Sequence, residues 1–103
     1  MTQHAILVKH EDVLTRLPRV LTLVHKGFSV FVPMHGRCGC LFNPPSQTDL
    51  SQHRRSITYA DFVADVRVYL EQVERGSNLD ITGDGVLIGA ISRCDSHRLV
   101  LLG

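Results

Sequence analysis

Hydrophobic and polar residues at the start of the chain follow three successive patterns. Residues 5–8 are all apolar, which predicts a short strand buried on both faces of a sheet. Residues 12–26 repeat apolar side chains every three or four positions, as in a helix with one buried stripe. Residues 28–34 alternate and are rich in β-forming residues, which predicts a second strand. Such a β-α-β unit predicts parallel strands joined by a right-handed crossover.

Pro18 lies in the middle of the first predicted helix, where it removes one hydrogen bond at a cost of roughly 3 kcal/mol. A helix that starts near Thr15 would place the proline in its first turn without this cost. The apolar stripe continues across Pro18, so we predict the longer helix with a kink, ended by Gly27 in a left-handed conformation.

Three start signals precede a second predicted helix. Thr58 is a suitable N-cap, Asp61 follows three residues later as in a capping box, and Ile57 can pack on Phe62 as a hydrophobic staple. An apolar stripe then continues to Gly76, which ends the helix.

The last quarter of the chain predicts a β-meander. Residues 79–82 form a short alternating strand, Gly83-Asp84 a tight turn, and residues 86–91 an apolar strand. A polar turn over residues 93–97 leads to a last strand over residues 98–102.

Together these elements predict one small domain, residues 1–103, of the α/β (α+β) class. We expect a mixed sheet of four to five strands with two helices, in the order β-α-β-loop-α-β-β-β. Residues 35–57 have no periodic pattern and are predicted to form an extended loop. Loops of this length often carry binding residues, so recognition is expected there.

Composition narrows the class of protein. The chain has 103 residues, 44% of them hydrophobic, and a formal net charge of +1, which disfavours binding of the whole domain to nucleic acid or to an anionic membrane. The apolar run near the N-terminus is too short for a signal peptide or a membrane span. Three cysteines, two of them separated by one residue, disfavour a disulfide-bonded secreted domain. We therefore predict a cytoplasmic protein with reduced thiols.

Cysteine and histidine residues form one candidate site. Cys38 and Cys40 follow the second strand, while Cys94 and His97 follow the strand over residues 86–91. If these strands run parallel, both segments lie at one end of the sheet, and thiolates with an imidazole are ligands that zinc prefers. A thiol-dependent reaction would use the same cysteines. The Cys-x-Cys spacing departs from common zinc motifs, and the alternative is that the cysteines pack as small apolar residues while the glycines serve turns.

Basic residues of the predicted loop form a second candidate site, which could contact the phosphates of a nucleic acid. They are His35, Arg37, His53, Arg54 and Arg55. The absence of interleaved aromatic residues disfavours this hypothesis, because base stacking requires them. No motif in the sequence identifies a catalytic residue.

Three predicted strands, residues 5–8, 86–88 and 99–102, are apolar on both faces, so both faces of the sheet need cover. Two helices on one face would leave the other bare, and a second copy of the chain would cover it. The leading hypothesis is therefore a small non-enzymatic interaction or regulatory module that acts as a homodimer and needs no cofactor. The alternatives are a zinc- or thiol-dependent protein and a nucleic-acid-binding module that uses Arg37, Arg54 and Arg55.

Overall fold

The computed structural model describes residues 3–35, 38–44 and 55–102. These residues form a seven-stranded mixed sheet in the order β4-β5-β6-β3-β2-β1-β7. The elements, in chain order, are β1 (Gln3–Leu7), η1 (His10–Asp12), α1 (Val13–His25), β2 (Val30–His35), β3 (Cys38–Asn43), β4 (Arg55–Thr58), α2 (Tyr59–Ala64), α3 (Val66–Glu74), β5 (Leu79–Gly83), β6 (Val86–Asp95), η3 (Ser96–Arg98) and β7 (Leu99–Leu102).

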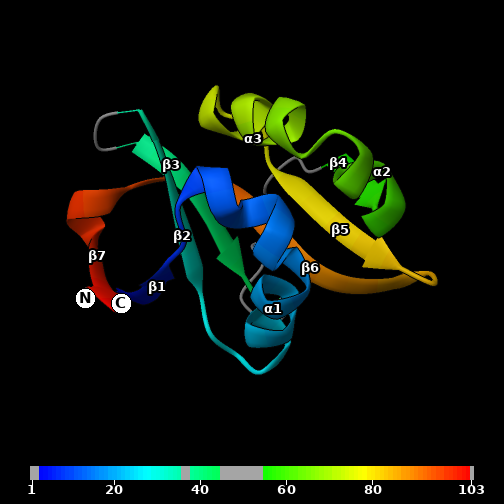
Figure 1. The fold of residues 1–103 in the computed structure, drawn as a ribbon, viewed down its shortest axis with the longest axis horizontal. Coiled ribbons are helices and arrows are strands. Elements are labelled where there is room, and N and C mark those ends of the chain that lie inside the picture. The colour runs from blue at the N-terminus through cyan, green and yellow to red at the C-terminus, as the bar shows by residue number, and fades with distance from the viewer. Residues whose placement is uncertain (1–2, 36–37, 45–54, 103) are drawn as a thin grey trace.

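All three α-helices pack on one face of this sheet, which we call the helix face (Figure 1). α1 contacts β2 and β6, α2 contacts β4 and β5, and α3 contacts β3 and β6. The main core lies between the helices and the sheet and contains the fully buried rings of Phe42 and Phe62. The opposite face, which we call the open face, carries a smaller buried cluster of Ala5, Phe31 and Leu41. None of the helices in the described residues is long and apolar enough to cross a membrane.

The α/β class and the first β-α-β unit are confirmed. β1 and β2 are parallel, with Ile6 opposite Val30. α1 extends from Val13 to His25 with Pro18 inside it, so the longer helix is the correct alternative. Gly27 follows the helix with a φ of +99°, the left-handed conformation predicted for it.

The second predicted helix is present but is divided at Asp65. Thr58 caps α2 as predicted, because its Oγ1 accepts a hydrogen bond from the backbone N–H of Asp61 at 3.1 Å. Asp65 then leaves the helical region (φ −141°, ψ 47°), and α3 begins at Val66. The break lets α2 lie on β4 and β5 while α3 lies on β3 and β6.

The prediction of an extended loop over residues 35–57 is wrong for three parts of that range, the first of which is His35 at the end of β2. Cys38–Asn43 form β3 in the middle of the sheet, where it pairs with β2 on one side and β6 on the other. Arg55–Thr58 form β4, which lies at one edge. The strand β3 was not predicted because Cys40 was not counted as an apolar residue, whereas in the structure it is fully buried like one. Residues 40–42 therefore make the continuous apolar run of a buried strand.

The predicted β-meander is correct only for its first hairpin, and the sheet has seven strands instead of four to five. β5 and β6 pair antiparallel, and the Asp84-Gly85 turn between them has positive φ at both residues (52° and 79°). β6 continues to Asp95, through part of the turn predicted over residues 93–97. β7 then pairs parallel with β1, at the far end of the sheet from β5.

Candidate interaction surface

The four predicted metal ligands lie near one end of the sheet but are divided between its faces. β2 and β6 each run antiparallel to β3, so they are parallel to each other, as the metal hypothesis required. Cys40 points into the helix-face core, and Cys38, two residues earlier in the strand, points the same way. Cys94 lies opposite Gly39 and packs against the open-face cluster. The structure therefore does not bring the four predicted ligands, Cys38, Cys40, Cys94 and His97, together on one face of the sheet.

Cys40 has a structural role in the core. Its Sγ donates a hydrogen bond to the carbonyl oxygen of Leu70 in α3 at 3.3 Å. Burial raises the pKa of the Cys40 thiol to about 12, and the negative charge of Glu74 adds to this effect. The thiolate is the form that binds zinc and acts as a nucleophile, and burial makes this form costly at Cys40.

Two of the other predicted ligands, Cys38 and His97, also have partners within the protein. Cys38 Sγ accepts a hydrogen bond from Arg93 Nη2 at 3.2 Å. His97 Nδ1 lies 2.7 Å from Asp95 Oδ1, within the turn formed by η3. Among the described residues, no group of three or more His, Cys, Asp or Glu side chains is arranged to hold a metal ion.

The predicted basic loop lies mostly outside the described residues. Arg37, His53 and Arg54 belong to that part, and only the backbone of His35 is described, at the end of β2. Arg55 begins β4 and is exposed. The nucleic-acid hypothesis stays a prediction.

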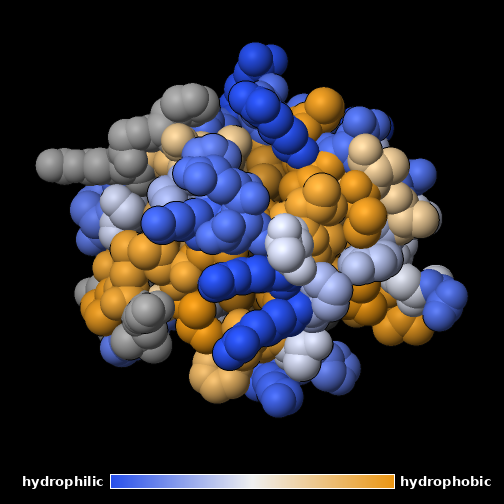
Figure 2. All heavy atoms as spheres, viewed as in Figure 1, coloured by the Kyte–Doolittle hydropathy of each residue, from blue (hydrophilic) through white to orange (hydrophobic). Residues whose placement is uncertain are grey.

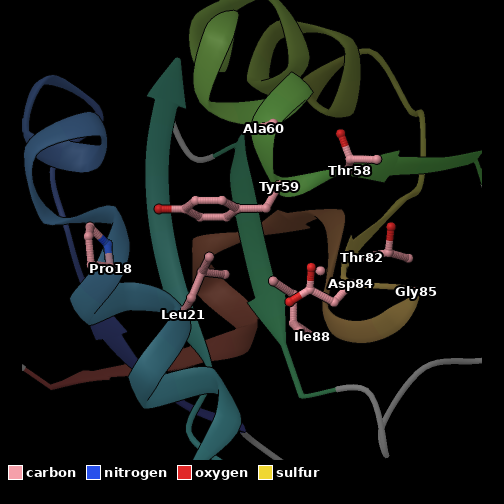
Figure 3. Close-up of a pocket in the computed structure, with 10 residues that line it drawn as sticks. Pro18, Leu21, Thr58, Tyr59, Ala60, Thr82, Asp84, Gly85 and Ile88 are labelled. Carbon is pink, nitrogen blue, oxygen red and sulfur yellow. The ribbon is translucent and has the colours of Figure 1, made fainter.

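A cleft of about 670 Å³ separates α1 from the start of α2 and the β5–β6 hairpin (Figure 3). Tyr59 extends across it toward Pro18 and Leu21 of α1, and Ile88 contributes a further apolar side chain. Two hydroxyl groups on its lining are engaged within the protein. Thr58 Oγ1 caps α2, and Thr82 Oγ1 donates a hydrogen bond to the carbonyl oxygen of Ile57. Asp84 supplies the single formal charge among the described lining residues.

The strongest candidate for binding is the end of the sheet formed by β1 and β7, which we call the β1–β7 end. β7 has the sequence Leu-Val-Leu-Leu and is an edge strand that pairs only with β1 among the described strands. Val100 and Leu101 are each 40% exposed, as is Leu7 of the neighbouring strand. Leu101 lies opposite Ala5 and therefore points to the open face, whereas Val100 points to the helix face. Both faces of this edge are apolar and partly uncovered.

Figure 2 shows how this surface compares with the rest of the visible side. Apolar side chains gather over the β1–β7 end, and a second apolar area lies between α1 and the α2–α3 junction. In the second area, Leu14, Val63 and Val68 are exposed and line a groove of about 470 Å³. Charged residues of both signs, Glu11 and Arg67 among them, line the same groove. The β1–β7 end therefore differs from this groove in having exposed apolar side chains on an edge strand.

The chain matches no protein-family model, no curated protein and no solved structure. The candidate surface therefore depends on geometry and composition alone. The sequence of residues 99–102 predicts a strand that is apolar on both faces, but the predicted meander puts this strand beside β6. The apolar pattern of β7 is visible in the sequence. Its position at the edge of the sheet depends on the strand order, which local pattern does not predict.

Proposed function

We propose that this protein is a small non-enzymatic interaction module of the cytoplasm that acts as a homodimer through its β1–β7 end. The observation that carries the proposal is the edge strand β7, on which Val100 and Leu101 are each 40% exposed. Exposed edges with apolar side chains are sites where another chain adds to a sheet, and native proteins otherwise protect them. None of the three cysteines forms a disulfide among the described residues, which supports a reducing compartment.

Burial of apolar surface supplies the driving force for this association. Leu7 and Leu101 lie on adjacent paired strands and point to the open face, while Val100 is exposed on the helix face of the same edge. Burying such side chains stabilises a complex by about 25 cal/mol per Å² of apolar area removed from water. Isolated exposed apolar residues are ordinary, but a group of them on an edge strand is typical of an interface.

Native mass spectrometry of the full chain over about 1–100 µM tests the proposal, because weak dimers form in the micromolar range. We expect a dimer whose fraction rises with concentration. Leu101→Lys places a charge on the edge and should shift the protein to monomer. Val86→Lys is the matched control, since Val86 is 63% exposed at the far hairpin and should leave the dimer unchanged. A wild-type chain that is monomeric throughout this range would exclude the homodimer.

A further inference from the structure

We infer that the two copies join edge to edge, with β7 of one copy pairing antiparallel to β7 of the other. The sheet then continues across the dimer, and the helices of both copies lie on the same side. This inference rests on the proposed homodimer and names its geometry. It differs from the expectation drawn from the sequence, in which the two copies cover each other's bare sheet faces.

The composition of the open face argues against stacking of face on face. Sheets that stack bury a broad apolar surface over several strands. On the open face, β4, β5 and β6 present Ser56, Asp80 and Ser92, as the strand register shows. Stacking would bury these polar groups, Asp80 among them, and burial of a carboxylate is costly. The exposed apolar side chains of this face, Leu7 and Leu101, lie only near the β7 edge.

The composition of β7 favours a second copy of the chain as the partner that pairs with this strand. A central strand forms backbone hydrogen bonds on both sides, and β7 pairs on one side only among the described strands. β7 contains no charged residue and no proline, so it can align with an identical strand without like-charge repulsion or a missing donor. An antiparallel pair of identical strands closes around a two-fold axis, and it creates no new edge at the junction.

Strand geometry then restricts the register. Residues directly opposite in an antiparallel pair share a face, and the two-fold axis stands perpendicular to the continued sheet. If most of the four residues of β7 are paired, Val100 lies opposite Val100 of the partner subunit, or Leu101 lies opposite Leu101 of the partner subunit. A register that places Val100 opposite Leu101 is excluded, because these residues point to opposite faces.

The length of β7 sets the expected affinity. The strand has four residues, so pairing with Leu7 and the flanking side chains buries less than the ~1,200 Å² typical of stable interfaces. The dimer should therefore be weak and depend on concentration, in contrast to an obligate dimer that persists on dilution.

Disulfide cross-linking tests the geometry. In a chain with Cys38→Ser and Cys94→Ala, Cys40 remains buried, and one new cysteine is introduced as Val100→Cys or Leu101→Cys. Two thiols held opposite each other meet the distance requirement of a disulfide, and their local concentration far exceeds that of free chains. We expect one of the two variants to cross-link roughly tenfold or more faster than a Val86→Cys control under mild oxidation. Circular dichroism and thermal melting confirm that each variant is folded.

Two other outcomes separate the inference from the proposed function. A dimer by native mass spectrometry, with cross-linking at residues 100 and 101 no faster than at residue 86, would overturn the edge geometry and leave a homodimer that uses another surface. A monomer at all concentrations would overturn both. Equal cross-linking of Val100→Cys and Leu101→Cys would contradict a single register and therefore the paired strand.

Discussion

The two edges of the sheet are built from opposite kinds of sequence. β4 has the sequence Arg-Ser-Ile-Thr, and Ile57 is its one buried residue. Its chain then continues directly into α2, which contacts β4 and β5. β7 is Leu-Val-Leu-Leu, with Val100 and Leu101 exposed. A charged residue in the strand and a helix beside it protect the β4 edge from pairing with another chain. Among the described residues, β7 has neither of these two features.

The residues that stabilise the fold also differ from those proposed to bind, because the former are buried and the latter are exposed. On the helix face, the ring of Phe62 in α2 lies 6.1 Å from that of Phe42 in β3 and 6.0 Å from that of Tyr69 in α3, with Phe42 and Phe62 fully buried. Near β7, the exposed apolar residues contribute less to folding because water still contacts them. Substitutions in this aromatic cluster should therefore change the free energy of unfolding, and those at the β7 edge should change association.

The largest effect is expected at the aromatic cluster. Phe62→Ala should reduce the free energy of unfolding by about 3–5 kcal/mol, since it removes a buried ring and leaves a cavity. Phe28→Ala is the matched control, because Phe28 is 49% exposed and should cost far less. Urea denaturation measures both. Equal losses would show that burial in the aromatic cluster does not set stability.

A smaller loss is expected at Gly39, which lies in β3 between two cysteines. A Cβ atom there would meet the backbone oxygen of Val32 and come within 2.6 Å of the Phe31 ring. Gly39→Ala should therefore destabilise the protein by about 1–3 kcal/mol through overpacking on the open face. Gly83→Ala is the control, because its nearest contact, with Ile88, is at an ordinary 3.5 Å. Thermal melting of the two variants checks the difference, and a tolerated Gly39→Ala would contradict this packing.

Gly39 also shows how far local pattern predicts the fold. The sequence Cys-Gly-Cys suggested ligands and a turn, whereas the glycine allows the Phe31 ring to lie against β3. Periodicity and capping residues, by contrast, correctly predict α1, the Thr58 cap and the β5–β6 hairpin, because each depends on neighbours in sequence.

The remaining elements depend on partners far away in the chain. The register of β3 against β6 decides that Cys38 and Cys94 point to opposite faces, and no spacing in the sequence contains that information. The position of β7 beside β1 is likewise non-local. The break at Asp65 occurs in a segment with no proline or glycine, where contacts of α2 and α3 with different strands override helix propensity.

The pH dependence of the free energy of unfolding tests whether the Cys40 thiol is buried under α3. Its pKa in the folded state is about 12 against an ordinary 9.0, so its contribution to stability is complete below pH 9 and is lost as pH rises to 12. Between pH 7 and pH 10, this group should lower the free energy of unfolding by about 1 kcal/mol. Cys40→Ala should lack that part of the decrease, as measured by urea denaturation at both pH values. An identical decrease in the two proteins would contradict a sealed core at Cys40.

The smallest effect on stability, and the one that most sharpens the contrast between the edges, is expected at β7. Leu101→Lys changes an exposed edge residue, so the free energy of unfolding of the monomer should change by less than about 0.5 kcal/mol. Urea denaturation well below the dimerisation range measures the monomer, while native mass spectrometry at high concentration measures association. The expected result is an unchanged monomer with a lost dimer. A large loss of monomer stability would mean that Leu101 belongs to the core, and the β7 edge would then be no more available for pairing than β4.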